Sequence, residues 1–516
     1  MISMQKLKSA VRDGLAILKR EPSLIEGAVY ASANRRVVGR LVYAHHFPSQ
    51  GLQEPKSDDD FGVSVQGYFK RNGEKVVGFG QIANDVSPDA VQRALKRAKA
   101  NAVLDPDFHG FPEPARERPE TKALADPSLL NLTPEREAKL LADISWKTLE
   151  GAFKVFERYR RAKGAIADPD FIVSGDNFLV TERMAMASTK GMLAAEENAV
   201  AMNLTSAMVE RAHAKGRGWR AAPSLRRLLP AETGAFAARQ AISGIGGERL
   251  PTGSYAVVFG PQAATEIFAN LLLASFSAAA LDFRLSLFPG KFGKPVASPL
   301  LSLYDDATFP GGAASKAVTD EGYATARVPL IEAGRFVGLL QNDYYRKKLL
   351  AETDKALNEK IGAGAREYLK GSPPRSGFRF GMGGGRVAAR EPGISATNLF
   401  IVSPEPCSRP ELLKRVKNGV YIGSLWYTYP IAGYTAGEIS GTAVADTYRI
   451  RNGRIAEPLR VNGVRIKANL RDMVKNIIGI TRDPVPTILW ASDEITYAPE
   501  VGIADIHCEE IRHDEA

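Results

Sequence analysis

The sequence contains few residues that bind metals or form disulfides, and no long apolar segment. Only 2 of its 516 residues are cysteines and only 6 are histidines. Two cysteines, Cys407 and Cys508, are a count typical of a reducing compartment. The N-terminus lacks the features of a secretory signal. The most apolar stretch, 268–281, contains Asn270 and two serines and falls short of the ~20 apolar residues of a membrane span. We therefore expect a cytoplasmic protein with no membrane-spanning segment.

Several active-site motifs are also missing. The chain has no G-x-S-x-G nucleophile elbow, no Walker A loop and no G-x-G-x-x-G motif after a strand. No two histidines occur at helical spacing on an apolar helix, as a zinc-protease site requires. His507, Cys508 and His513 lie close together but in a charged C-terminal segment, which we interpret as a solvated, mobile terminus.

The charge balance does not favour nucleic-acid binding. The net charge is +10, from 68 Lys and Arg against 58 Asp and Glu, and 44% of the residues are hydrophobic. Basic residues gather at 35–40, 158–163, 217–227 and 346–348, with few aromatic residues between them. A nucleic-acid surface combines basic and aromatic side chains, so we interpret these clusters as solvated faces or partner contacts. The composition is typical of a globular protein, and the length predicts two to four domains.

Local signals in the first half of the chain predict small units of helices and strands. Asn72 and Gly73 predict a hairpin turn, because both turn residues tolerate a positive φ. Ser87 and Pro88 predict a helix start, with serine as the N-cap and proline at the first helical position. The expected elements are a helix over 1–20, short strands at 29–30 and 37–43, hairpin strands at 61–69 and 75–82, a helix over 88–102, a Pro-rich linker at 111–119, a helix over 133–163, strands at 171–174, 178–188 and 192–210, a basic loop over 217–230 and a helix over 231–245.

The second half is punctuated by glycine and reads mostly as strands. Its expected exception is one helix from Pro261 to about Asp282, apolar nearly all round and therefore buried. Residues 350–393 form a polar, Gly- and Pro-rich excursion. We predict an α+β fold, in which small N-terminal α/β units precede a large β-rich domain with a buried helix. The expected regions are an N-terminal α+β domain (1–120), a middle α/β region (121–245) and a β-rich C-terminal domain (246–516).

Motifs along nearly the whole chain resemble those of the TldD/PmbA family, also called the TldD/TldE metalloproteases. The Asp320-Glu321-Gly322 sequence, followed by a strand and a turn at Gly334, is a specific part of the match. The matching segments are Gly78–Gln81, Gly253–Ser275, Tyr304–Leu340, Tyr448–Leu459 and Lys467–Asp483. Thr435–Ser440 departs from the tighter turn typical of the family.

The resemblance implies a degenerate metal site in this chain. TldD-type subunits bind their metal through a His-Glu-x-x-x-His helix and a cysteine near the C-terminus. Here Thr265 and Asn270 replace the two histidines, while Glu266 is retained. Neither neutral side chain can replace imidazole as a strong zinc ligand. The chain therefore resembles the PmbA/TldE-type subunit, and we expect no catalytic residue, metal or cofactor in it, with zinc in a TldD-type partner. Glu266 is expected to be a buried, hydrogen-bonded helix residue rather than a base.

Three functions follow as hypotheses. In the first, the chain forms a heterodimer with a zinc-bearing TldD-type subunit, and the complex encloses and processes unfolded peptides, which add as extra strands. In the second, the chain pairs with itself as a peptide-binding protein without hydrolytic activity. In the third, suggested by an older name of the family, it modulates DNA gyrase. The expected partners are a TldD-type subunit or a second copy, and an unfolded peptide; no membrane or nucleic-acid partner is expected.

Overall fold

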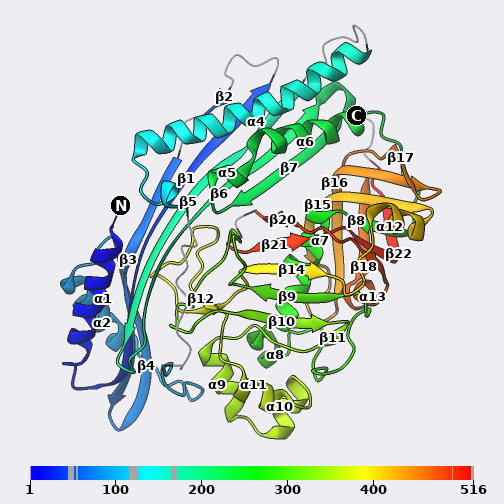
Figure 1. The fold of residues 1–516 in the computed structure, drawn as a ribbon. Coiled ribbons are helices and arrows are strands. Elements are labelled where there is room, and N and C mark those ends of the chain that lie inside the picture. The colour runs from blue at the N-terminus through cyan, green and yellow to red at the C-terminus, as the bar shows by residue number, and fades with distance from the viewer. Residues whose placement is uncertain are drawn as a thin grey trace.

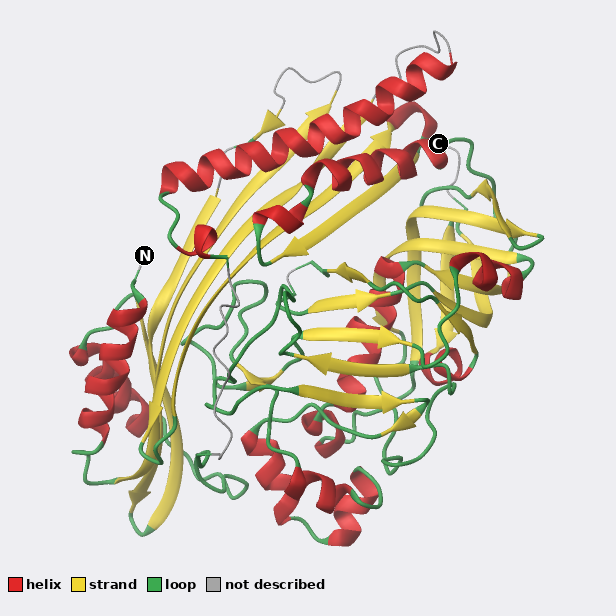
Figure 2. Cartoon of the chain, viewed as in Figure 1, coloured by secondary structure: helices red, strands yellow, loops and turns green. Residues whose placement is uncertain are grey.

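The computed structural model describes residues 2–44, 51–53, 56–114, 126–163, 171–490 and 492–512. A long curved sheet built from the first half of the chain faces a β-rich C-terminal half (Figures 1 and 2). The predicted α+β fold with a β-rich C-terminal portion is confirmed. Among the described residues, no helix is both long and apolar enough to cross a membrane.

The N-terminal sheet is antiparallel and has the strand order β4-β3-β1-β5-β6-β7, with β2 paired to β1. Its strands are β1 (Leu24–Ala44), β2 (Gly51–Leu52), β3 (Lys56–Arg71), β4 (Glu74–Ala83), β5 (Phe171–Ser188), β6 (Leu193–Val209) and β7 (Ala214–Ala222). Strand β1 pairs with β5 from Ala28–Ser188 to Ala44–Ile172. The regions expected as 1–120 and 121–245 thus share one sheet; the three-part division itself stays a prediction.

Three predictions in this sheet were wrong. Residues 171–174 and 178–188 belong to one 18-residue strand, β5. Residues 29–30 and 37–43 belong to one 21-residue strand, β1. Arg35 and Arg36 interrupt its apolar pattern, but Arg35 is paired with Asp59 and Glu137 and so is accommodated within the strand. The expected basic loop begins inside β7, where Arg217 to Arg220 are strand residues that pair with β6.

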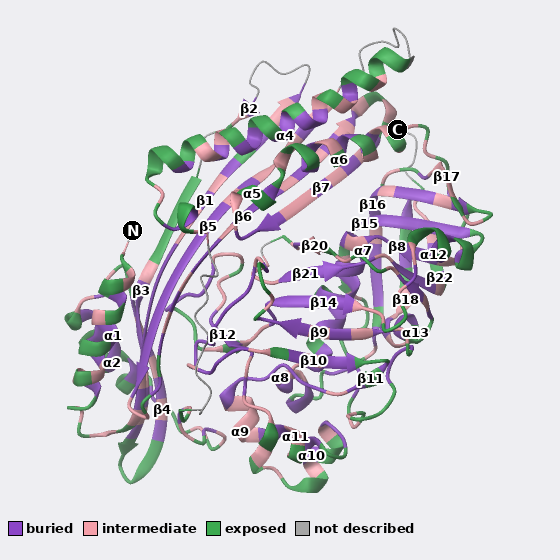
Figure 3. Ribbon diagram, in the orientation of Figure 1, coloured by how far each residue is buried: buried purple, intermediate pink, exposed green. Residues whose placement is uncertain are grey.

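Helices cover one face of this sheet, and the C-terminal half covers the other. The helices are α1 (Met4–Leu18), α2 (Pro88–Ala100), α3 (Pro127–Leu130), α4 (Pro134–Lys163), α5 (Leu225–Leu228) and α6 (Pro230–Ser243). Alternation along β1 separates the faces: Val29 and Ala31 pack with α1 and α2, whereas Tyr30 packs against Val318 of the C-terminal half. The second half of β5 is consequently buried on both faces (Figure 3). The predicted Ser87 cap and Asn72-Gly73 turn are confirmed.

The C-terminal half contains two further main sheets, in the orders β11-β10-β9-β14-β21-β20 and β15-β8-β22-β18-β16-β17, with β19 paired to β22. The strands are β8 (Gly253–Phe259), β9 (Ser302–Asp306), β10 (Arg327–Glu332), β11 (Arg335–Phe336), β14 (Asn398–Val402), β15 (Gly419–Pro430), β16 (Glu438–Arg451), β17 (Arg454–Pro458), β18 (Val464–Asn469), β19 (Ile477–Ile480), β20 (Val485–Thr487), β21 (Ile495–Ala498) and β22 (Val501–Glu510). The helical segment 261–282 lies in the core that both sheets share.

This segment is buried, as predicted, but it is not one regular helix. It consists of α7 (Pro261–Thr265), a π-helical turn η2 (Glu266–Leu272), a 3₁₀ turn η3 (Leu273–Phe276) and α8 (Ala278–Asp282). Wide π turns often occur at functional sites.

The C-terminal half is β-rich as predicted, but the polar excursion expected at 350–393 and the residues just before it form short helices and strands. The region contains α9 (Asp343–Ala351), α10 (Asp354–Lys360), α11 (Ala365–Gly371) and the strand pair β12 (Gly377–Phe378) and β13 (Gly393–Ile394), and α12 (Arg409–Val416) and α13 (Leu470–Lys475) follow. The helices at 343–371 are short and polar, with Asn342 and Thr353 as caps. Few apolar residues of these helices, among them Leu349 and Leu357, pack against the core. The helical spacing of apolar residues is therefore weak in this part of the sequence.

The interpretation of the C-terminal segment as a mobile terminus was also wrong where the structure describes it. His507 and Cys508 lie in β22, between β18 and β8. The Cys508 side chain is buried and His507 is exposed. His513, like His45 and His46, lies outside the described residues.

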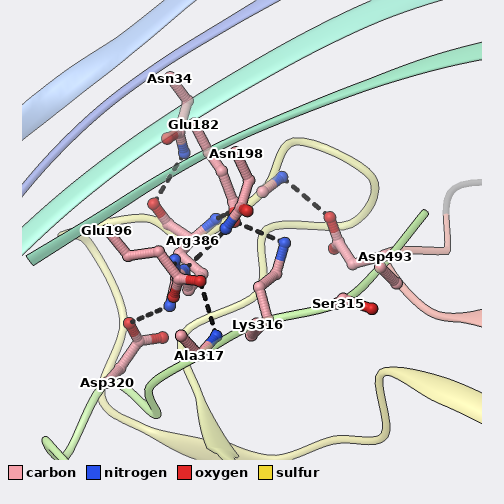
Figure 4. A network of polar contacts seen from close by, with 12 residues as sticks. Asn34, Glu182, Glu196, Asn198, Ser315, Lys316, Ala317, Asp320, Arg386 and Asp493 are labelled. Atoms are coloured by element: carbon pink, nitrogen blue, oxygen red, sulfur yellow. Dashed lines mark hydrogen bonds and ion pairs between the residues drawn. The ribbon is translucent and has the colours of Figure 1, made fainter. Parts of the chain in front are cut away.

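A buried network of charges joins the curved sheet to the C-terminal half (Figure 4). Its centre is Arg386, fully buried and within 2.8 Å of Glu196, 3.3 Å of Glu182 and 3.7 Å of Asp320. Lys316 adds a 2.5 Å ion pair with Glu182. Burial by itself would raise the pKa of Glu182, but Lys316 and Arg386 together lower it to about 2. The Glu182 carboxylate of β5 is therefore held charged by two cations from the other half.

Replacing Arg386 with methionine should destabilise the protein strongly. The change preserves much of the side-chain volume but leaves three buried carboxylates without their shared cation, which typically costs about 3–5 kcal/mol. Urea unfolding of Arg386→Met against wild type measures the loss. Arg451→Met is the control, since Arg451 is paired with Glu457 at the surface and should shift the midpoint little. Equal effects from the two substitutions would contradict the central role of Arg386.

Candidate functional site

The segment that carries Thr265, Glu266 and Asn270 begins where the sequence predicted. Pro261 is the first helical residue and Gly260 is the N-cap. A Cβ atom at position 260 would lie 2.7 Å from the Tyr421 hydroxyl oxygen, so glycine allows α7 to start close against β15.

Glu266 is hydrogen-bonded by two amides that also anchor the helix to β15. Gln262 Nε2 donates to Glu266 Oε1 at 3.0 Å, and Asn270 Nδ2 donates to Oε2 at 3.3 Å. Gln262 also accepts from the Leu425 backbone N–H at 2.9 Å, and Asn270 donates to the Thr428 carbonyl at 3.2 Å. The expectation of a buried, hydrogen-bonded Glu266 agrees with this geometry.

Burial perturbs the acid–base behaviour of Glu266. Removal from solvent raises its pKa to about 7, against the opposing effect of the nearby Arg217 guanidinium and of the amide donors. Burial also lowers the pKa of Arg217, which lies on β7 of the curved sheet. The Arg217 guanidinium carbon is 5.3 Å from the centre of the Trp426 ring. A glutamate from one half thus faces a cation from the other.

Two adjoining cavities meet at Glu266, and together we call them the Glu266 cavity. The larger, about 560 Å³, is lined by Asn270, Tyr427 and Asp493 among others. The smaller, about 150 Å³, extends to Arg217 and Trp219 on β7. Both are also lined by Trp426, Leu489 and Trp490. Glu266 therefore faces both spaces, and only the smaller one lies between the two halves of the molecule, because the larger one, which Asn270 lines, is formed by the C-terminal half alone.

Thr265 does not share this orientation. It is fully buried, and its hydroxyl donates to the Pro261 carbonyl at 2.8 Å. It lines neither part of the Glu266 cavity. One residue along a helix turns the side chain by about 100°, and here that turn directs Thr265 into the core.

The residues at the cavity do not fit a zinc centre. Beside Glu266 the cavity offers a carboxamide, aromatic side chains and the carboxyl groups of Asp493 and Glu494, whereas zinc prefers imidazole and thiolate ligands. Cys508 packs in the core of the C-terminal half, and burial raises its pKa to about 12, far from the thiolate that metal binding needs. Within the described ranges, no group of three or more His, Cys, Asp or Glu side chains could hold a metal ion.

The Asp320-Glu321 motif lies elsewhere and connects structural elements. Asp320 accepts from the Tyr30 hydroxyl at 2.9 Å and from the Arg379 backbone N–H at 2.6 Å. Glu321 accepts from the backbone N–H of Asp343, the first residue of α9, at 3.0 Å. The motif therefore links α9, the 379–386 segment and the curved sheet.

Arg217, Trp219, Trp426, Tyr427 and Trp490 are site residues that sequence reasoning missed. They come from β7, β15 and the segment after β20, which only the fold brings together. The run Trp426-Tyr-Thr-Tyr429 was a signal, since adjacent aromatic residues that end a strand are uncommon on a solvated surface. Tyr427 also adopts a left-handed backbone, with φ of 52°.

The fold combines a curved N-terminal sheet with a β-rich C-terminal half whose buried helical segment carries Glu266 at a cavity. Residues 252–510 match the model of the PmbA/TldA metallopeptidase C-terminal domain. The chain belongs to the PmbA/TldD family. It is 26% identical over 240 residues to a metalloprotease of Methanothermobacter thermautotrophicus, and 28% identical over 192 residues to one of Synechocystis sp.. These alignments cover 45% and 37% of this chain, but only 44% and 34% of the relatives.

Solved structures share the fold along the whole chain. TldE from Thermococcus kodakarensis superposes with a TM-score of 0.75 at 17% identity, covering 98% of this chain and 100% of the other. A proposed modulator of a DNA gyrase from Thermotoga maritima gives 0.72 at 21% identity, with 97% and 99% covered. At these identities the likeness establishes the fold.

Glu266→Gln should make stability less dependent on pH. The folded-state pKa of about 7 lies above the ordinary value near 4.3, so the folded protein holds this proton more tightly than the unfolded chain does. Wild type should therefore lose up to about 3 kcal/mol through this group as the pH rises from 4.5 to 7. Glutamine removes that loss, so the unfolding free energy of Glu266→Gln in urea should rise relative to that of wild type by up to about 3 kcal/mol between pH 4.5 and pH 7. A difference that stays constant with pH, as expected for the exposed control Glu405→Gln, would contradict the raised pKa.

The double substitution Thr265→His and Asn270→His should not create a tight zinc site. Only position 270 opens to the cavity, and neither a third ligand nor a supporting hydrogen-bond shell is in place. Calorimetric titration should give a Kd weaker than about 1 μM. The single variant Asn270→His, which leaves the buried Thr265 intact, keeps the test valid if the double variant unfolds. Tight binding at one site would show that the cavity is already shaped for zinc.

Proposed function

We propose that this chain is a metal-free, TldE-like subunit that pairs with a zinc-bearing, TldD-type chain to form a cytoplasmic peptidase. Its role would be to close a chamber that admits extended peptides. The observation that carries the proposal is the Glu266 cavity: the helix and its glutamate keep their place beside an internal space, while the ligand positions hold Thr265 and Asn270. Both cysteines are unpaired and buried, which supports a reducing compartment.

An exposed aromatic surface beside this cavity supports pairing. We define it as Tyr427, Tyr429, Ile431 and Tyr434, at the end of β15 and in the following turn, with Trp490 nearby. Each of these side chains is at least half exposed, and that of Tyr427 is 71% exposed. Apolar patches of this kind mark protein–protein contacts, and aromatic residues are enriched in such interfaces. A partner that covers this surface would also close the Glu266 cavity.

The distribution of charge gives little support to direct DNA binding. Arg35 and Arg40, from the first basic cluster, are bound to Glu137 and Asp176 respectively. A phosphate would have to compete with these carboxylates.

Co-expression with a TldD-type partner tests the proposal. We expect a stable heteromer with zinc and peptidase activity, whereas the isolated chain should carry well under one zinc and cleave no peptide. Tyr427→Ser with Tyr434→Ser should weaken pairing at least about tenfold, since aromatic anchors dominate interface energies. Trp146→Ser, an exposed aromatic on α4, is the control. Stoichiometric zinc with proteolysis by the isolated chain, or a stable homodimer that ignores the partner, would overturn the proposal.

A further inference from the structure

A second cavity, of about 520 Å³, lies on the other side of Trp219 from the Glu266 cavity. Gly218 and Trp219 line both spaces. We call it the Asp446 cavity. Its walls come from β7, α6, β15, β16 and the segments before α12 and β22, so both halves of the molecule contribute.

Asp446 lines this cavity with a backbone that a strand residue rarely adopts. It lies inside β16 but has a φ of 53°, in the left-handed region. Its carboxylate lies over Gly423 of β15, where any side chain would collide with it. Non-glycine residues held in this conformation concentrate at functional sites. Asp446 thus has a strained backbone, and glycine at position 423 is the one residue type that leaves room for its carboxylate.

Glu500 supplies a second buried carboxylate in the same cavity. Its Oε1 accepts from the Tyr421 hydroxyl at 3.2 Å and lies 3.2 Å from Arg409 Nε. Its Oε2 is buried and has no hydrogen-bond partner among the described residues. Burial raises the pKa of Glu500, and it raises that of Asp446 to about 7. Glu500 therefore keeps one acceptor oxygen unused in the same cavity as the Asp446 carboxyl group, an arrangement that a bound cation would stabilise.

The rim of the cavity carries exposed arginine side chains, in contrast to the carboxyl groups at its floor. Arg239 and Arg482 are exposed, and neither has an ion-pair partner in the described part of the chain. Trp219 and Phe236 form an aromatic wall with ring centres 6.3 Å apart. The site thus offers acceptors for a cation at its floor, aromatic surface at its side and guanidinium donors for a carboxylate or carbonyl at its mouth.

We propose that the Asp446 cavity binds the α-ammonium group of a peptide or amino acid, with Asp446 and Glu500 accepting its N–H groups. The rim arginines would bind the ligand's carbonyl or carboxylate oxygens. An organic cation fits better than a metal ion, since within the described ranges no group of three or more His, Cys, Asp or Glu side chains could hold a metal ion. The inference does not depend on zinc, on a partner or on peptide cleavage.

Calorimetric titration of the isolated chain with four small probes tests this. Alaninamide carries the ammonium alone, N-acetylalanine the carboxylate alone, and alanine and dialanine carry both. We expect saturable binding of alaninamide and dialanine and none of N-acetylalanine. Alanine binding as tightly as dialanine would identify a free amino acid as the ligand, whereas a preference for dialanine would identify a peptide terminus.

Conservative variants locate the binding. Asp446→Asn and Glu500→Gln should each weaken dialanine binding at least about tenfold, because each removes a charged hydrogen-bond acceptor. Asparagine tolerates the left-handed backbone at position 446, and Glu457→Gln, on the neighbouring strand β17, should change affinity less than about twofold. Absence of saturable ammonium binding to wild type, unchanged affinity in both variants, or displacement of dialanine by Mg²⁺ or Ca²⁺ would overturn the inference. None of these results bears on the Glu266 cavity, which the partner experiment tests.

Discussion

The internal geometry of this protein depends on the buried guanidinium of Arg386. An ion of this size is costly to remove from water, and only close carboxylates with good geometry compensate for that cost. Here the carboxylates come from β5, β6 and the Asp320 loop, so compensation requires both halves of the molecule in one arrangement. Hydrophobic contacts alone would allow the two halves to slide against each other. This network of ion pairs, in contrast, specifies one register, that is, one position of the curved sheet relative to the C-terminal half. The distance from the curved sheet to the Glu266 helix follows from it.

The Asp446 cavity and the smaller part of the Glu266 cavity depend on that register, because residues of both halves line each of them. The Glu266 cavity has its helix on one side and Arg217 of β7 on the other. The Asp446 cavity has its carboxylates in the C-terminal half and Phe236 of α6 opposite. Trp219 separates the two, held by a hydrogen bond from its Nε1 to Thr487 at 3.2 Å. A shift of the sheet would therefore change both spaces together.

The sequence predicted elements whose signals are local. The Ser87 cap, the Asn72-Gly73 turn and the helix from Pro134 need only neighbouring residues, and all three occur in the structure. Where interpretation failed, the cause was a contact distant in sequence. Arg35 interrupts the pattern of β1 yet pairs with Glu137, and the short polar helices at 343–371 depend on a core assembled from the whole C-terminal half. The same distinction between local and distant contacts applies to the site. A local motif predicted Glu266 and Asn270, whereas Arg217 and Trp219 lie in a different region of the chain and reach the site only through the fold.

The retention of Glu266 has a physical explanation that does not require catalysis. Its two oxygens accept from Gln262 and Asn270, and both amides also bond to the backbone of β15. The carboxylate therefore completes a set of hydrogen bonds that hold the π turn against the strand. A neutral amide at this position could accept through only one oxygen, so one of the two anchoring amides would lose its acceptor. Burial makes the ionised form of Glu266 unfavourable. Its second acceptor oxygen nevertheless keeps the helix aligned with the cavity, with or without a metal.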